Sequence, residues 1–151
     1  MIIGFGTGRS GSVSFSEVLN IWHELKIDGK YLSELDNKDA WLRRIVKGSE
    51  TWGKTEGDVS LDHINNLNYW LRQDVTRICL MRGREETVDS LENYFTRRIW
   101  QRLFPQFDFE KREDLYRYYD WYYDTILKHE DKFIIINPEQ FDTKLNKTRK
   151  R

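Results

Sequence analysis

The hydrophobic pattern of the chain alternates between short apolar runs and longer segments with helical spacing. Residues 1–5, 75–81 and 133–136 are compact apolar runs, which predict buried strands. Residues 30–33 and 50–54 are weaker strand candidates. Elsewhere apolar residues recur every three or four positions, and this spacing predicts helices. The predicted helices cover residues 11–25, 39–47, 61–71 with Ser60 as the N-cap, 88–95 and 115–126.

This order of elements predicts an α/β fold. Strands that alternate with helices of these lengths form parallel sheets with helices on both faces. We therefore expect a three-layer sandwich with a central parallel sheet, in one domain over residues 1–143. Val13 and Val18 of the first helix and Phe95 of the fourth are expected to face the core. Ligands bind such sheets at the carboxyl ends of the strands, near a switch in strand order, so functional residues are expected there.

Composition restricts the kinds of partner. Six Trp, eight Tyr and eight Phe indicate a packed core, although the mean hydropathy is −0.78. The 25 basic and 25 acidic residues cancel, so no overall positive field attracts nucleic acid or an anionic membrane, and any anion site must be local. Five bases fall within residues 144–151. We expect a solvated tail there, with ordering over a bound phosphate as the alternative.

The few cysteine and histidine residues exclude several kinds of site. A single cysteine, Cys79, excludes a disulfide framework and a cysteine-rich zinc site, and we expect it in the core. His23, His63 and His129 lack metal-ligand spacing and are expected at or near the surface, so no metal is predicted. No apolar run approaches the roughly 20 residues of a membrane span. The N-terminus lacks the features of a signal peptide, and we expect a cytoplasmic protein.

The loop after the first predicted strand combines glycines, hydroxyl side chains and one arginine. Glycines let a backbone turn tightly and approach a ligand closely. Unpaired N–H groups at the start of the following helix favour an anion, and Arg9 adds a permanent charge with forked donors. The loop therefore predicts a cradle for phosphate or sulfate. Its expected ligand-binding residues are Thr7, Gly8, Arg9, Ser10, Gly11, Ser12, Val13 and Ser14.

Several other interpretations of this loop are open. The spacing of Gly6, Gly8 and Gly11 matches a dinucleotide fingerprint, with Glu34 or Asp36 as the acid that such a site requires. A nucleoside-triphosphatase loop has the same outer glycine spacing, but Ser12 stands where its lysine belongs. A plain glycine-rich turn that only caps a helix would not need an arginine and so many hydroxyl groups.

The loop resembles the 5′-phosphosulfate loop of the sulfotransferases, which use 3′-phosphoadenosine 5′-phosphosulfate (PAPS). The resemblance rests on the sequence Gly-Thr-Gly-Arg-Ser-Gly-Ser-Val-Ser-Phe, and the arginine form is similar to the carbohydrate and bacterial branches. It implies a P-loop-like sulfotransferase fold, PAPS as co-substrate and 3′-phosphoadenosine 5′-phosphate (PAP) as product. It also implies that Arg9 holds the phosphosulfate and stabilises the leaving group.

A second motif follows the strand at residues 75–81. Arg82 ends this strand, and Ser90 stands eight residues later in the next predicted helix. A guanidinium and a hydroxyl that reach one point are suited to bind a phosphate. Sulfotransferases carry an arginine and a serine with this spacing, and the resemblance implies that the pair binds the 3′-phosphate of the nucleotide. Arg84 stands where many members of the family have a proline, which departs from their pattern in the turn.

The resemblance also suggests residues for catalysis. Lys54-Thr55-Glu56 is similar to a family segment in which lysine contacts the sulfate and the third residue is the base, so Lys54 and Glu56 are expected to be catalytic. A polar loop without chemistry is the alternative. Glu34 is a rival base, since some branches place a glutamate after the second strand. In the aromatic run, Tyr118, Tyr119 and Tyr122 are expected in the core, and Tyr116, Trp121 and Tyr123 are candidates to line an acceptor pocket.

Together these motifs predict a PAPS-dependent sulfotransferase that transfers a sulfuryl group to a hydroxyl or amine. The acceptor is expected to be a small molecule or a carbohydrate. A P-loop-type nucleotide kinase and a non-catalytic nucleotide-binding module are the alternatives, because each would also use a glycine-rich anion loop.

Overall fold

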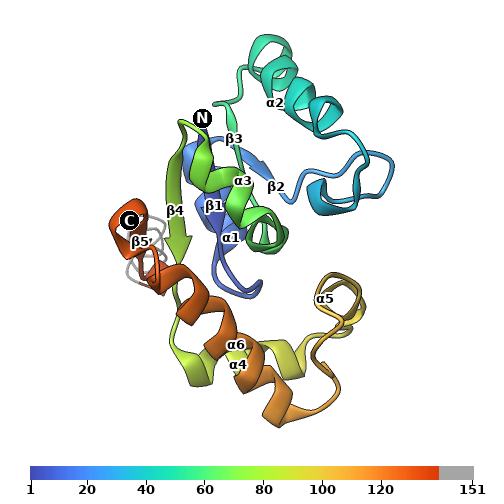
Figure 1. Ribbon diagram of the computed structural model, residues 1–151, viewed down its shortest axis with the longest axis vertical. Coiled ribbons are helices and arrows are strands. Elements are labelled where there is room, and N and C mark those ends of the chain that lie inside the picture. The colour runs from blue at the N-terminus through green and yellow to red at the C-terminus, as the bar shows by residue number, and fades with distance from the viewer. Residues whose placement is uncertain (140–151) are drawn as a thin grey trace, which may run out of the picture.

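The computed structural model describes residues 1–139, and it is built around a five-stranded sheet (Figure 1). The strand order is β2-β3-β1-β4-β5, and every neighbouring pair is parallel. The strands are β1 (Ile2–Phe5), β2 (Trp22–His23), β3 (Gly57–Val59), β4 (Thr76–Leu80) and β5 (Ile134–Ile136).

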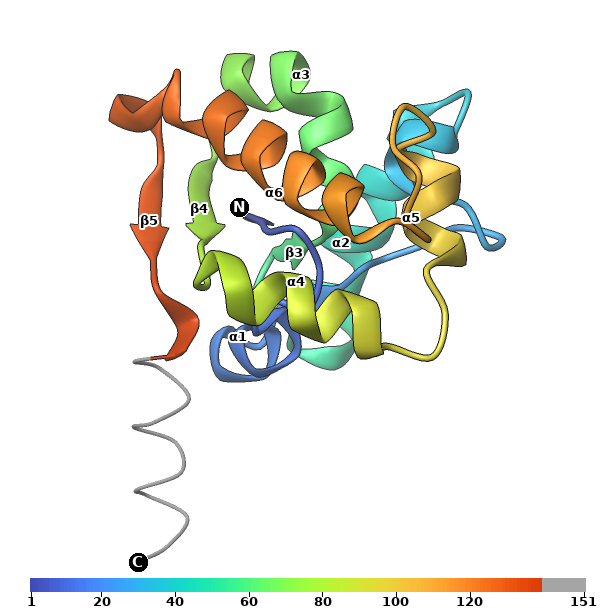
Figure 2. The ribbon, with the colours of Figure 1, turned by 90° about the horizontal axis from the view of Figure 1, so that it is seen from below.

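Helices connect these strands and cover the sheet. They are α1 (Ser12–Leu19), α2 (Lys38–Trp52), α3 (Leu67–Arg72), α4 (Arg84–Asn93), α5 (Arg98–Leu103) and α6 (Arg112–Leu127). Three short 3₁₀ segments cover Leu32–Glu34, Leu61–Asn66 and Glu130–Lys132. The helices α4 and α6 pack against one another, and in Figure 1 they lie beyond the end of β4 toward which its arrow points. Figure 2 shows the same two helices running side by side.

The sheet separates two unequal hydrophobic clusters, as the period of two in a strand requires. On one face Phe15 of α1 packs with Val59 and Leu80 of the strands. The opposite face carries a larger aromatic cluster to which α2, α3 and α6 contribute. Its fully buried side chains include Ile3, Phe5, Trp41, Ile45, Trp70, Phe104, Tyr118 and Tyr122. Helices on both faces of an all-parallel sheet confirm the predicted α/β class and are consistent with a three-layer sandwich.

Two predicted strands are wrong. Residues 32–34 form a 3₁₀ turn, and residues 50–52 are the end of α2. The helix α2 begins at Lys38, where the Asn37 side chain caps it by accepting a hydrogen bond from Asp39 N. It ends at Trp52, and Gly53 with φ +65° forms its C-cap. The true strands β2 and β3 have two and three residues, too few to produce a recognisable apolar run.

Several predicted side-chain positions are also corrected. Val13 and Val18 are exposed because α1 turns Phe15 and Ser16 toward the sheet instead. Phe95 lies beyond the end of α4 and is 84% exposed. His63 is deeply buried rather than near the surface. Two expectations are confirmed: Cys79 is buried in the core, and the Ser60 side chain caps the following 3₁₀ segment. The basic segment 144–151 lies outside the described residues.

The topology places a switch point at the centre of the sheet. After β1 the chain turns toward β2 and β3 on one side, and after β4 it turns toward β5 on the other. The carboxyl ends of β1 and β4 therefore open onto the crevice where ligands bind in open α/β sheets. Within residues 1–139, no helix has both the length and the apolar character needed to cross a lipid bilayer.

The packing of α2 provides a direct test of this core. Ile45 is fully buried and its neighbour Val46 is 41% exposed. We expect Ile45→Ala to lower the free energy of unfolding by about 2–5 kcal/mol, because it leaves a cavity in the aromatic cluster. Val46→Ala, the matched control, should change it by less than about 1 kcal/mol. Urea denaturation followed by circular dichroism measures both, and equal losses would contradict this position of α2.

Candidate anion-binding site

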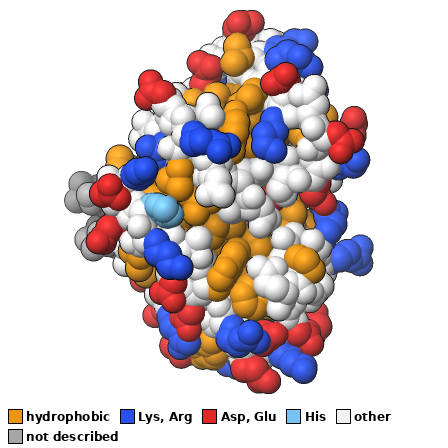
Figure 3. Space-filling model, in the orientation of Figure 1, with side chains coloured by type: hydrophobic (Ala, Val, Ile, Leu, Met, Phe, Trp, Pro, Cys, Tyr) orange, Lys and Arg blue, Asp and Glu red, His pale blue; other side chains and the backbone are white. Residues whose placement is uncertain are grey.

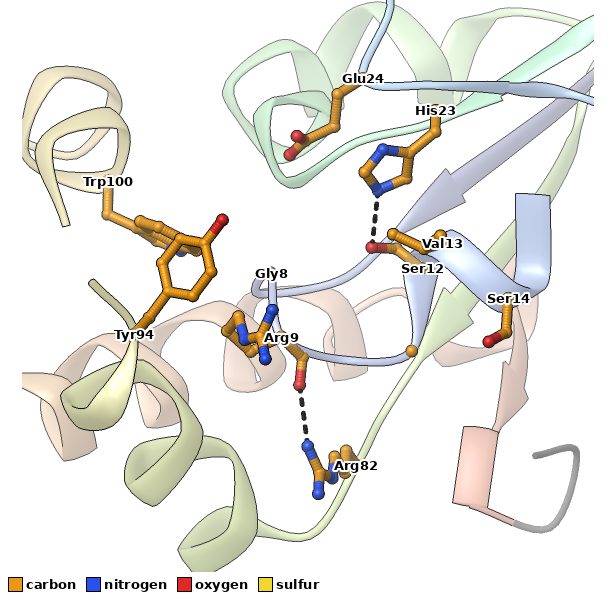
Figure 4. Close-up of a pocket in the computed structure, with 11 residues that line it drawn as sticks. Gly8, Arg9, Ser12, Val13, Ser14, His23, Glu24, Arg82, Tyr94 and Trp100 are labelled. Carbon is orange, nitrogen blue, oxygen red and sulfur yellow. Dashed lines mark hydrogen bonds between the residues drawn. The ribbon is translucent and has the colours of Figure 1, made fainter. Parts of the chain in front are cut away.

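A cavity of about 300 Å³ opens at the carboxyl ends of β1 and β4 (Figure 4). Its wall combines the loop after β1, the end of β2, the end of β4 and two aromatic side chains. The lining residues are Gly8, Arg9, Gly11, Ser12, Val13, Ser14, His23, Glu24, Arg82, Tyr94 and Trp100. The volume is at the lower end of the range for small-ligand pockets.

The loop after β1 leaves most of its backbone N–H groups, those of residues 8–14, without partners in the described part of the chain. Gly8, Arg9 and Gly11 have φ values of +83°, +56° and +85°, and backbone turns of this kind form concavities that bind anions. Within the described part of the chain, none of the backbone N–H groups of residues 8–14 donates a hydrogen bond. The start of α1 adds the positive end of a helix dipole. The predicted cradle therefore has free donors at the position expected from the sequence.

Aromatic side chains from α5 and α6 support this loop from behind. The Thr7 carbonyl accepts hydrogen bonds from Trp100 Nε1 at 2.8 Å and from the Tyr118 hydroxyl at 2.7 Å. Gly6 N donates to the Tyr122 hydroxyl at 2.9 Å, and the Tyr123 hydroxyl donates to the Leu80 carbonyl at 2.6 Å. Hydrogen bonds in a buried, low-dielectric environment hold a backbone firmly, although the buried Ser10 hydroxyl of this loop has no partner in residues 1–139. The loop is thus fixed by its polar contacts to buried rings.

The structure brings the two predicted anion motifs together. Arg9 Nε donates to Ser90 Oγ at 3.0 Å, and Arg82 NH1 donates to the Arg9 carbonyl at 3.3 Å. The Arg9 guanidinium also lies over the Tyr94 ring, 4.6 Å from its centroid. Arg82 Nε forms an exposed ion pair with Glu139 at 3.3 Å. Two guanidinium groups and one hydroxyl therefore converge on the edge of the cavity.

The hydroxyl side chains of the loop differ in their availability. Thr7 and Ser10 are completely buried, and the Thr7 hydroxyl donates to the Gly8 carbonyl. Both can contribute to a ligand only through their backbone. Ser12 Oγ lies 3.0 Å from His23 Nε2 (Figure 4), and Ser14 lines the cavity without a protein partner among the described residues. Ser12 and Ser14 are therefore the loop residues whose hydroxyl groups are available at the cavity wall.

Lys54 and Glu56 lie at the amino-terminal end of the strands, opposite the cavity, which corrects their expected position. The Glu56 carbonyl accepts a hydrogen bond from Ile2 N at 3.0 Å, so Glu56 is level with the start of β1. The loop begins after Phe5, roughly 10 Å further along that strand. Lys54 Nζ lies over the Trp22 ring at 5.0 Å. Both residues precede β3, so the parallel register directs them away from the cavity.

Glu34 also fails to reach the cavity. Its carboxylate pairs with Arg102 Nε at 2.9 Å and accepts a hydrogen bond from Tyr31 N at 3.0 Å. These bonds cap the 3₁₀ turn that replaces the predicted second strand. With both contacts made, Glu34 is a structural cap and is not among the residues that line the site.

His23 and Glu24, which the sequence did not indicate, provide the titratable groups of the cavity. His23 is the second residue of β2, and Glu24 comes directly after it. The apolar spacing of the sequence predicts both residues at the end of the first helix instead. Burial lowers the pKa of His23, so its ring is neutral near pH 7. Burial raises the pKa of Glu24, which has the unusual φ of +52° and donates its N–H to the Val59 carbonyl at 2.8 Å. Positive φ at a non-glycine residue is a frequent mark of a functional site.

The aromatic run of α6 packs the core rather than the cavity. Tyr118, Tyr119 and Tyr122 are buried as expected, and Tyr123 is buried with them, contrary to its expected pocket position. Trp121 packs against Phe104 and Phe107, and the Tyr116 hydroxyl donates to Glu85. The aromatic lining of the cavity comes instead from Tyr94 and Trp100.

The contact between Gly8 and Trp100 provides a test of the loop. A Cβ at Gly8 would lie 2.8 Å from the Trp100 ring, whereas a Cβ at Gly29, with a similar φ of +76°, would meet no atom within 4 Å. We expect Gly29→Ala to cost about 1–2 kcal/mol of folding free energy through backbone strain alone. Gly8→Ala should cost more, because the ring or the loop must move. Urea denaturation measures the difference, and equal costs would contradict this packing.

The raised pKa of Glu24 predicts how stability depends on pH. A carboxyl whose pKa is raised in the folded state stabilises the protein below its ordinary pKa, and this stabilisation is lost as the pH rises through the folded value. Glu24→Gln should therefore raise the melting temperature at pH 7.5 but not at pH 4. Exposed Glu17→Gln is the control. Calorimetry that showed no difference between the two variants at pH 7.5 would contradict the burial of this carboxyl.

Comparisons of the chain with protein-family models, with curated proteins and with solved structures found no match. The cavity combines a loop with unpaired N–H groups, two arginines, and a half-buried histidine and glutamate side by side.

Proposed function

We propose that the protein is a PAPS-dependent sulfotransferase with a P-loop-like sulfotransferase fold. The observation that carries this proposal is the convergence of Arg9, Arg82 and Ser90 at one edge of the cavity, beside the free N–H groups of the loop. A nucleotide with phosphates at both its 5′ and 3′ positions needs two neighbouring anion sites of this kind. Neither alternative interpretation of the loop requires an arginine and a serine after β4.

The cavity supports a division of roles between its two sides. The loop N–H groups, with Ser12, Ser14 and Arg9, are suited to the 5′-phosphosulfate. Arg82 and Ser90 are suited to the 3′-phosphate. Their present contacts with Glu139 and Arg9 are exposed, and exposed polar contacts of this kind are worth only about 0–1 kcal/mol, so a phosphate can replace them.

Glu24 takes the place of Glu56 and Glu34, the two bases expected from the sequence. In the proposed reaction the acceptor oxygen attacks sulfur, the bond between sulfur and the bridging phosphate oxygen breaks, and PAP leaves with the electron pair. Glu24 removes the acceptor proton, and its raised pKa makes it a more effective base near neutral pH. Arg9 and the loop N–H groups stabilise the charge that develops on the leaving phosphate.

Three alternative functions are less well supported by the strand order, the loop sequence and the cavity. Dinucleotide-binding folds place the first two strands next to each other, whereas here β3 lies between β1 and β2. A P-loop nucleotide kinase would have a lysine at the position of Ser12. A binding module without catalysis would use the same anion site but would not need a half-buried glutamate with a raised pKa beside it.

Calorimetry and sulfate transfer together test the proposal. The protein should bind PAP more tightly than NAD or ATP with magnesium, and it should transfer labelled sulfate from PAPS to a small hydroxylated or carbohydrate acceptor. Glu24→Gln should retain PAP binding and lose most of the transfer. Preference for ATP with magnesium would favour a kinase, and PAP binding without transfer to any acceptor would favour a binding module.

Arg82 provides the sharpest mutational test of the nucleotide site. We expect Arg82→Ala to weaken PAP binding by about 1.5–3 kcal/mol, which is roughly 10- to 150-fold in Kd, because a charged hydrogen bond to phosphate is lost. Arg84→Ala is the matched control, since Arg84 pairs with Asp120 and does not line the cavity. Equal Kd values for the two variants would exclude Arg82 from the site.

A further inference from the structure

A buried pair of an aspartate and a histidine lies outside the cavity wall and has no role in the proposed reaction. Asp58 of β3 and His63 are 0% and 1% exposed, and Asp58 Oδ2 lies 2.8 Å from His63 Nε2. Buried pairs of this kind cost desolvation energy, and well-packed apolar residues often replace them without loss of stability. The contacts of Asp58 and His63 should therefore explain why these two polar residues occupy the core.

The surroundings of His63 restrict it to one polar contact. Its ring lies in a box of aromatic edges from Phe5, Trp41 and Trp70, with centroid distances of 5.5–5.9 Å. Its Nδ1 is buried and has no partner in residues 1–139. The ring is therefore oriented by packing, and its Nε2 is directed at Asp58.

Asp58 in turn holds the segment that carries Glu24. Its Oδ1 accepts a hydrogen bond from Leu25 N at 2.9 Å, while Glu24 N donates to the Val59 carbonyl at 2.8 Å. The N–H groups of Glu24 and Leu25 are thus bonded to two consecutive residues of β3. Glu24 has φ +52°, a conformation that persists only where surrounding contacts enforce it.

We propose that Asp58, oriented by His63, is a positioning residue that holds Glu24 in its strained turn and places a negative charge behind the Glu24 carboxyl. The role of Glu24 as the base rests on the proposed function. The effect of Asp58 on Glu24 does not, because it follows from the contacts between β3 and the turn.

The charges around Glu24 determine the sign of this effect. Asp58 raises the pKa of Glu24 in addition to the larger effect of burial, whereas Lys26, the Tyr31 hydroxyl and His63 lower it. Asp58 also raises the pKa of the neighbouring His23. Removing the charge of Asp58 should therefore lower the pKa of both cavity residues.

Carbon-13 NMR of the glutamate side chains tests this without any assay of activity. We expect Asp58→Asn to lower the pKa of Glu24 and His63→Gln to raise it, relative to the wild type. Asp62→Asn is the matched control, because Asp62 is equally buried but its carboxylate accepts from Ser33 and Asn65 and not from the turn. An unchanged Glu24 pKa in folded Asp58→Asn protein would overturn the proposal.

The pH dependence of sulfate transfer separates positioning from a general structural role. In Asp58→Asn the acidic limb of kcat/KM should move to lower pH and the plateau should fall, since Glu24 becomes a weaker base. A merely structural defect would lower the rate at every pH and leave the limb in place. If no variant and no wild-type protein transfers sulfate while the Glu24 pKa still shifts, the proposed function fails and the positioning of Glu24 stands.

If Asp58→Asn and His63→Gln both fail to fold, the wild-type protein still provides a test. In the wild type, the amide resonance of Leu25 should shift with pH at the midpoint shown by the Asp58 carboxyl, because Leu25 N donates directly to Asp58. A Leu25 amide that does not follow this titration would overturn the proposal.

Discussion

The hydrogen bonds from buried aromatic side chains to the loop after β1 are the contacts on which the rest of the site depends. A loop that offers its N–H groups to an anion cannot pair them in regular secondary structure, so its conformation must be held by other atoms. Trp100 and Tyr118 meet at the Thr7 carbonyl, and Tyr122 accepts from Gly6 N. The tyrosines of α6 thus have a physical reason: Tyr118 and Tyr122 fill the core while their hydroxyls bond the loop, and Tyr119 and Tyr123 donate to carbonyls at the end of β4.

The charge distribution is local rather than global. Acidic and basic side chains are interspersed over the surface in Figure 3, in keeping with a net charge of zero. The cavity nevertheless gathers two guanidinium groups where β1 and β4 diverge, and no carboxylate of α4 lines it. Such a site selects an anion by its donor geometry and does not depend on long-range attraction.

The acidic side chains of Glu24 and Asp58 differ from the two arginines, because their charged forms destabilise the fold. Burial raises the pKa of both Glu24 and Asp58, so their ionised forms cost folding free energy at neutral pH. A strained turn and an ion pair in an aromatic box add to this cost. The aromatic core compensates for this cost, and the contacts hold Glu24 at one position in the wall of the cavity.

The sequence by itself determined the features that depend on neighbouring residues. The apolar runs of β1 and β4, the glycine loop, and the arginine and serine after β4 were all predicted, because a strand end and the next helix fix their relative positions over a few residues. Only the tertiary structure determined β2, β3 and the residues beside them. The two-residue strand β2 pairs with β3, and the three-residue strand β3 pairs with β1. This register places Glu24 in the cavity wall and Glu56 at the amino-terminal end of the strands. No local pattern encodes such a register, since it arises from hydrogen bonds between segments more than thirty residues apart.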